Sequence, residues 1–232
     1  MLSILQKEKY NKIFHFAWEG LPDRSYHVSR SNLELSKKFL NCFTSEGTTE
    51  FNLMGSCLEY GDITGPVNDD AKPNGDSDFA KTKIELNEYI KSKKVNYKWY
   101  RPFYVYGSGQ NSKSLFPTLI NSVKTGKVAQ FKSLSNSHDF ISVEDLTKAI
   151  FEASHNKSIW GEINVGTGLI HSVGDIVENF YKLNGILFSE KYVNVPGLYS
   201  KSDKLNQILK WKPNTRTLQN ILDYLMNLSS KT

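Results

Sequence analysis

The sequence is poor in cysteine, contains no long apolar run, and has no glycine-rich turn near its start. Two cysteines, Cys42 and Cys57, are too few for a disulfide scaffold or a zinc cluster. No apolar run approaches the ~20 residues that a membrane-spanning helix needs. The first ten residues mix charges into the place where a signal peptide has its apolar core. We therefore expect a cytoplasmic protein with no membrane segment and no metal site.

Charge of neither sign dominates, although the formal net charge is +5. The densest basic cluster, Lys91, Lys93 and Lys94, follows a predicted helix, where cations suit the helix dipole. Nucleic-acid binding would need a basic stripe interleaved with aromatic side chains, and the sequence has none. We therefore expect no nucleic-acid partner, while a mildly basic surface suits a small anionic molecule.

What the chain does contain is an alternation of apolar strands and amphipathic helices, which is typical of an α/β protein with a parallel sheet. We predict strands over 12–17, 50–55, 97–105, 140–143 and 162–165, and helices over 29–43, 79–91 and 115–125. Ser142 and Ser172 each stand three residues before an aspartate, the spacing of a helix capping box. Residues 202–228 predict a helix, a turn at Lys212-Pro213, and a second helix.

The usual opening of a dinucleotide-binding fold is missing from the start of the sequence. Such a fold begins with a strand, a glycine-rich turn and a helix whose N-terminus receives a pyrophosphate. Here residues 4–9 predict the end of a helix, and the strand at 12–17 follows directly. The one glycine-spaced turn between a strand and a helix, Gly166 to Gly168, lacks a third glycine and is better explained as a tight turn.

The predicted fold is therefore α/β, with an incomplete Rossmann-like parallel sheet flanked by helices and a small C-terminal substrate lobe. We expect residues 1–107 to form the partial Rossmann-like domain and residues 138–168 to return to its sheet. Residues 108–137 and 169–232 are expected to form the substrate-binding lobe.

Eight local motifs stand in one order along the chain. They are FHFA at 14–17, Asn32, GSCLEYG at 55–61, FAKTK at 79–83, RPFYVYG at 101–107, HDFISVED at 138–145, NVGTG at 164–168 and WKP at 211–213. No single motif is decisive, but eight in the correct order and with plausible spacing are hard to obtain by accident. Together they resemble the NAD-dependent epimerase/dehydratase family of extended short-chain dehydrogenase/reductases, in an N-terminally truncated form.

The resemblance implies a specific chemistry. In the family, a tyrosine takes a proton from a sugar hydroxyl while hydride passes to NAD or NADP. A lysine one helical turn away lowers the pKa of the tyrosine and holds the nicotinamide ribose, and a serine binds the same hydroxyl. Ser56 and Lys83 match the serine and the lysine, but Phe79 stands in place of the tyrosine. A phenyl ring has no proton to exchange, and losing a general base typically costs on the order of 10²–10⁴ in rate.

The resemblance also assigns the binding residues. It implies cofactor contacts for four residues: Ala17, Asn32, Lys83 and Arg101. It implies substrate contacts for Ser56, Tyr104 and His138, of which His138 replaces an arginine that the family uses on the diphosphate. A neutral imidazole is a poorer anion clamp than a guanidinium.

Simpler interpretations stand beside these assignments. Ser56 can be a strand-end residue that satisfies backbone groups, and Lys83 a solvated helix lysine. Phe79 is then an apolar filler of the cleft. We interpret Asp139 and Asp145 as residues that cap helices and fix loops, rather than as catalytic groups.

Two functions follow as expectations. The first is an NAD(P)-dependent nucleotide-sugar epimerase/dehydratase-type protein with impaired catalysis. The alternative is a non-catalytic remnant that acts as a sugar-nucleotide-binding module or as an oligomerisation partner of an intact homologue. Because family members dimerise through the helices equivalent to 29–43 and 79–91, the resemblance also implies a homodimer.

Overall fold

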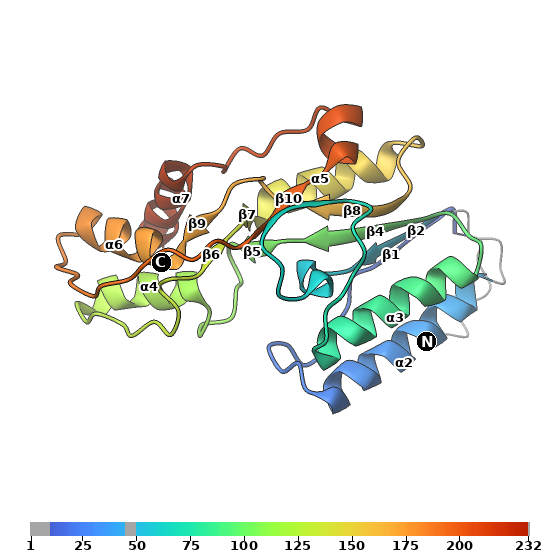
Figure 1. Cartoon of the computed structure of the whole chain (residues 1–232), viewed down its shortest axis with the longest axis horizontal. Coiled ribbons are helices and arrows are strands. Elements are labelled where there is room, and N and C mark those ends of the chain that lie inside the picture. Colours follow the sequence, from blue (N-terminus) through green and yellow to red (C-terminus); the bar gives the residue numbers. More distant parts are fainter. Residues whose placement is uncertain (1–9, 45–49, 232) are drawn as a thin grey trace.

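A four-stranded parallel sheet forms the centre of the larger lobe (Figure 1). The structure, a computed structural model, describes residues 10–44 and 50–231. The strands lie in the order β1 (Lys12–His15), β2 (Glu50–Met54), β4 (Tyr97–Pro102) and β8 (Gly161–Val165). The predicted α/β fold with a parallel, Rossmann-like sheet is confirmed.

Helices cover both faces of this sheet. Helices α2 (Tyr26–Thr44) and α3 (Asp78–Ser92) lie side by side on one face, and α5 (Val143–His155) lies on the other (Figure 1). Side chains alternate along a strand, so Trp99 of β4 packs under α2 and α3, whereas Tyr100 packs towards α5. Both aromatic side chains are completely buried, which makes β4 the centre of the lobe.

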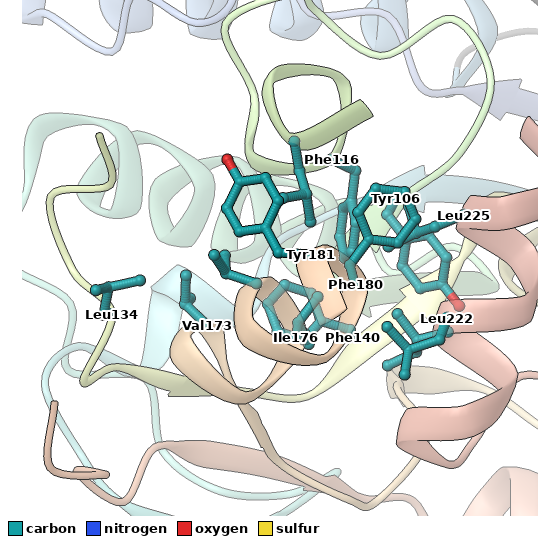
Figure 2. Close-up of a cluster of buried hydrophobic side chains, with 13 residues drawn as sticks. Tyr106, Phe116, Leu134, Phe140, Val173, Ile176, Phe180, Tyr181, Leu222 and Leu225 are labelled. Atoms are coloured by element: carbon teal, nitrogen blue, oxygen red, sulfur yellow. The ribbon is translucent and has the colours of Figure 1, made fainter. Parts of the chain in front are cut away.

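The smaller lobe is helical. Helices α4 (Leu115–Thr125), α6 (Val173–Leu183) and α7 (Leu218–Lys231) surround one apolar cluster, shown in Figure 2. Phe180 points from α6 into this cluster. Three two-stranded sheets join the lobes: β3 (Gly65–Asn68) with β10 (Leu198–Lys201), β5 (Tyr104–Tyr106) with β7 (Phe140–Ser142), and β6 (Ser137–His138) with β9 (His171–Ser172).

Most predicted elements are present, with altered ends. The strand expected over 97–105 divides at Phe103, whose amide donates to the carbonyl oxygen of Val165 after β4 has ended at Pro102. A proline cannot donate to a sheet, so the chain changes sheets at this point. Strands β3 and β10 were not predicted, because GPVN and LYSK carry little apolar alternation.

The predicted caps are confirmed. The hydroxyl groups of Ser142 and Ser172 accept hydrogen bonds from the amides of Asp145 and Asp175. In the tail, only a single π-helical turn, η2 (Lys204–Ile208), precedes α7. The helix end expected at 4–9 lies outside the described residues. Within the part of the chain that the structure describes, no helix has the length and apolarity needed to cross a membrane.

Candidate functional site

The turn after β2 places Ser56 at the carboxyl end of the central sheet. The Ser56 hydroxyl accepts a hydrogen bond from the amide of Leu58 at 3.2 Å, and the Ser56 amide donates to Oε1 of Glu59 at 2.8 Å. These bonds form a capping box for the short 3-10 helix η1 (Cys57–Tyr60). Gly55 is required before it, because a Cβ atom there would lie 2.2 Å from the Trp99 indole nitrogen.

A buried ion pair between Glu59 and Arg101 packs against this turn. Glu59 is fully buried, and its Oε2 accepts from Nε of Arg101 at 2.7 Å while its Oε1 accepts from the Trp99 indole at 3.0 Å. Arg101 also donates to the hydroxyl of Tyr60 at 3.0 Å and is only 1% exposed. Arg101, expected at the cofactor, therefore has its guanidinium committed to the core beneath the Ser56 turn.

Phe79 and Lys83 lie together on the buried side of α3. The Lys83 ammonium donates to the carbonyl oxygen of Met54 at 2.9 Å and sits 3.7 Å from the centre of the Trp18 ring. Lys83 is 4% exposed, and burial lowers the pKa of its amine to about 7. The interpretation of Lys83 as a solvated helix lysine is therefore wrong. Phe79 meets Trp18 edge-on, with ring centres 5.5 Å apart.

The residues as placed do not present Lys83 to a cofactor. Its ammonium is bonded to Met54 and covered by Trp18, so a ribose hydroxyl cannot reach it while the indole stays there. The side chain of Asn32 is also occupied, since it accepts from the amide of Glu19 and donates to the carbonyl oxygens of Glu19 and Val28. Ala17 is exposed beside this loop.

Arg24 also contacts this cluster, through the ring of Phe79. Its guanidinium carbon lies 5.3 Å from the centre of the Phe79 ring. Burial raises the pKa of the Cys57 thiol and of the Tyr104 phenol to about 12 each, and the charge of Arg24 partly opposes both shifts. Neither Trp18 nor Arg24 belongs to the motifs that identified the site, so the sequence carried no signal for them.

Tyr104 and His138 form a stacked pair between two pockets. Their ring centres are 3.8 Å apart, with an angle of 26° between the planes. A pocket of about 390 Å³ lies against this pair, and its lining includes Lys113, Phe131 and Lys132. A second pocket, of about 270 Å³, shares Tyr104 and His138 and adds polar residues of the η1 turn and its surroundings, among them Asp62, Thr64 and Asn136.

The structure thus brings the predicted residues together in two groups. Phe79 and Lys83 share one cluster, and Tyr104 and His138 share a wall. Burial lowers the pKa of His138 to about 4, so its imidazole is neutral at pH 7. The lysines at the first pocket were not predicted, because no motif contains them.

The two aspartates of the HDFISVED segment that were interpreted as structural, Asp139 and Asp145, bond backbone amides of distant loops. The buried carboxylate of Asp139 accepts from the amides of Thr167, Gly168 and Ser200 at 2.7–3.0 Å. The carboxylate of Asp145 accepts from the amides of residues 214 and 215, both at 2.9 Å. Both therefore fix loops by satisfying backbone donors.

Known proteins resemble this chain in sequence and in fold. A dTDP-6-deoxy-L-talose 4-dehydrogenase (NAD(+)) from Aggregatibacter actinomycetemcomitans is 21% identical over 188 residues, which is 78% of this chain and 68% of the relative. A GDP-6-deoxy-D-talose 4-dehydrogenase from the same organism is 33% identical over 111 residues, 47% of this chain and 36% of that protein. The chain thus spans about a third of the length of that second relative.

A solved structure shares the fold. It is a tyrosine-to-phenylalanine mutant of UDP-glucuronic acid 4-epimerase from Bacillus cereus, in complex with UDP-4-deoxy-4-fluoro-glucuronic acid and NAD. It matches with a TM-score of 0.80 and 23% identity, over 98% of this chain and 78% of its own. A profile of the NAD dependent epimerase/dehydratase family matches residues 1–166, well over half of the sequence. The chain therefore belongs to the NAD-dependent epimerase/dehydratase family.

Proposed function

We propose that this protein binds a nucleotide sugar in the two pockets that meet at Tyr104 and His138, and that it does so without the family's tyrosine-based proton transfer. The shared aromatic wall is the observation that carries the proposal. The larger pocket, about 390 Å³, falls within the ~300–1,000 Å³ typical of small-molecule sites. Its neighbour is lined by side chains that can hydrogen-bond sugar hydroxyls.

The charges at the pockets fit an anionic ligand. Lys113 and Lys132 both line the larger pocket, and both are exposed, so their ammonium groups can move towards a diphosphate. His138 adds no charge at neutral pH, because burial holds its pKa at about 4. We therefore assign the electrostatic attraction for the diphosphate to the two lysines, and the contact with a ring of the ligand to the Tyr104 stack.

Phe79 is evidence against the family's tyrosine-based catalysis in this chain. Its ring offers no proton, and the ammonium of Lys83 faces Trp18 instead of a phenol. Binding does not depend on that proton. The Bacillus cereus mutant carries a tyrosine-to-phenylalanine change and still holds both a sugar nucleotide and NAD. By analogy, we expect this chain to bind its ligand and to leave it unconverted.

Isothermal titration calorimetry tests the proposal with UDP-glucose, dTDP-glucose and GDP-mannose as probes. We expect heat with at least one of them, and a loss of affinity of about tenfold or more in Tyr104→Ala, since stacking on an aromatic ring contributes on the order of 1–3 kcal/mol. Tyr26→Ala, at a tyrosine that is 57% exposed, is the matched control and should bind normally. No heat with any probe would refute the proposal.

A second candidate function is an active NAD(P)-dependent epimerase or oxidoreductase. Ser56 and Lys83 favour it, because both stand at their motif positions and close to the end of β2. NAD or NADP would then be the cofactor. Of its further proposed contacts, Ala17 is exposed, whereas Asn32 and Arg101 would have to exchange their present hydrogen bonds for bonds to the cofactor. Turnover by the unaltered protein separates the two candidates, and turnover that appears only in Phe79→Tyr would show that the cleft is otherwise assembled.

We also propose that the protein forms a homodimer through α2 and α3. The two helices are fixed to each other by Glu85, which accepts from Arg30 at 2.7 Å and from Lys37 at 2.6 Å. Leu35 of α2 is left 53% exposed. Light scattering should report a dimer that Leu35→Glu dissociates, whereas Leu183→Glu, at an equally exposed leucine of α6, should not. An intact homologue is the alternative partner for the same face.

We also propose that the chain has two domains and that the protein is cytoplasmic. Residues 1–107 and 138–168 form the Rossmann-like domain, and residues 108–137 and 169–232 form the substrate-binding lobe. Both pockets receive lining residues from each of the two parts, which supports a substrate site at their junction.

A further inference from the structure

The ammonium of Lys83 has two contacts that together enclose it. The ammonium donates to the carbonyl oxygen of Met54 at 2.9 Å, and it lies 3.7 Å from the centre of the Trp18 indole ring. A buried cation needs such compensation, because leaving water is costly for a charged group. Since the Met54 carbonyl belongs to the sheet, Trp18 is the only one of the two partners that can move aside.

Trp18 is held by the loop between β1 and α2. The next residue, Glu19, donates its amide to Oδ1 of Asn32 at 2.7 Å and accepts from Nδ2 of Asn32 at 3.0 Å. Phe79 supports the indole from the side, edge-on. Asn32 is therefore a positioning residue for Trp18 in this arrangement.

The position of Trp18 is also unfavourable in one respect. Its indole N–H is buried and has no acceptor within residues 10–44 and 50–231. A buried donor without a partner costs free energy that the same donor regains when it meets water or a ligand. In this position the indole gains a contact with the Lys83 ammonium but makes no hydrogen bond through its N–H. A ligand that binds the ammonium therefore has to replace only the first of these two contributions.

We propose that Trp18 is a gate over Lys83, which a hydroxyl-bearing ligand such as the ribose of a dinucleotide must displace to reach the ammonium. The choice of a dinucleotide as the ligand rests on the second candidate function, in which NAD or NADP is the cofactor, and the gate itself rests on the contacts of Lys83 and Trp18. In the closed arrangement, Trp18 itself serves as the partner of Lys83. A ligand that binds the open arrangement has its affinity reduced by the fraction of molecules that are closed.

Chemical labelling tests the gate without any ligand. Reductive methylation with formaldehyde and cyanoborohydride modifies accessible amines, and mass spectrometry reads each lysine separately. Lys81, two residues away on the same helix and exposed, is the internal standard. Burial lowers the pKa of the Lys83 amine to about 7, so each rate is divided by the fraction of that amine that is unprotonated, measured from the pH dependence of labelling. We expect the corrected rate of Lys83 in the wild type to be about a tenth of that of Lys81 or less, and Trp18→Ala to raise it at least about tenfold.

A matched variant controls for the loss of a tryptophan. Trp160 covers the ammonium of Lys98 at 4.1 Å, so Trp160→Ala removes the same kind of contact elsewhere and should leave the Lys83 rate unchanged. Circular dichroism verifies that both variants fold. A corrected Lys83 rate in the wild type as high as that of Lys81, or an unchanged corrected rate in folded Trp18→Ala, would overturn the gate.

Calorimetry with NAD then tests competition. We expect Trp18→Ala to bind NAD at least about tenfold more tightly than the wild type, because the intrachain competitor is gone. No gain in NAD binding would overturn the gate as a control on ligand access. Failure of every nucleotide sugar to bind would refute the proposed function instead, and would leave the labelling result unchanged.

Discussion

Arg101→Met removes one partner of the buried ion pair under the Ser56 turn. Glu59 keeps its bonds to the Ser56 amide and the Trp99 indole, but its carboxylate loses the guanidinium that contacts it at 2.7 Å. Breaking a buried pair in this way costs about 3–5 kcal/mol, since an uncompensated charge remains in the core. For a chain of this size, that corresponds to a fall in Tm of roughly 6–20 °C.

The structure supplies a matched control for this prediction. Arg30 pairs with Glu85 at the same 2.7 Å distance, but both side chains are 42% exposed. Arg30→Met should therefore cost about 1 kcal/mol or less, because water replaces the lost partner. Differential scanning calorimetry and urea unfolding of both variants measure the contrast, which distance alone would not produce.

A double variant separates charge from packing. Glu59→Gln combined with Arg101→Met removes both charges of this pair, so the double variant should recover at least about 1 kcal/mol relative to the sum of the single variants. The reasoning fails if Arg101→Met costs no more than Arg30→Met. It also fails if the double variant is fully additive, which would mean that the two side chains do not stabilise each other.

Three further predictions concern the site and its supports. Phe79→Tyr alone should give no turnover of UDP-glucose with NAD, measured by chromatography of the sugar nucleotides, because Lys83 faces Trp18; product formation would show a competent cleft. Burial lowers the pKa of His138 from its ordinary 6.5 to about 4, so the unfolded chain binds the proton first and stability should fall as pH drops through that window. Urea unfolding between pH 7 and pH 4.5 should show a smaller fall for His138→Phe. Tyr181→Phe removes a buried hydroxyl that bonds Ser122 at 2.7 Å and the Ala129 amide at 2.9 Å, and should cost about 1–3 kcal/mol in thermal unfolding, whereas an unchanged Tm would contradict the assigned bonds.

The sequence predicted the sheet and its helices well because both depend on local periodicity. The run from Glu50 to Met54 is buried along almost its whole length, and such runs are easily recognised. The short joining strands were not predicted, because their pairing depends on partners far away in the chain. Leu198, for example, pairs with Gly65, and nothing near either residue indicates it.

The candidate site could likewise be predicted from the sequence only in part. Ser56, Phe79 and Lys83 could be located by motif, because each stands at a fixed spacing on a strand end or a helix. Their surroundings could not, since Trp18 reaches Lys83 from a loop that no motif describes. The contacts of the Lys83 ammonium depend on residues far away in the sequence. These contacts determine whether the lysine of the motif can reach a ligand.

The stacked pair of Tyr104 and His138 has a consequence for how recognition can change over evolutionary time. Both rings line both pockets, so a substitution at either position alters the two pockets together. A substitution of Tyr104 or His138 that changes binding of the ligand part in one pocket then also changes binding of the part in the other pocket. New specificities should arise at the outer walls, at positions such as Lys132 or Asn136, while the shared partition stays constant.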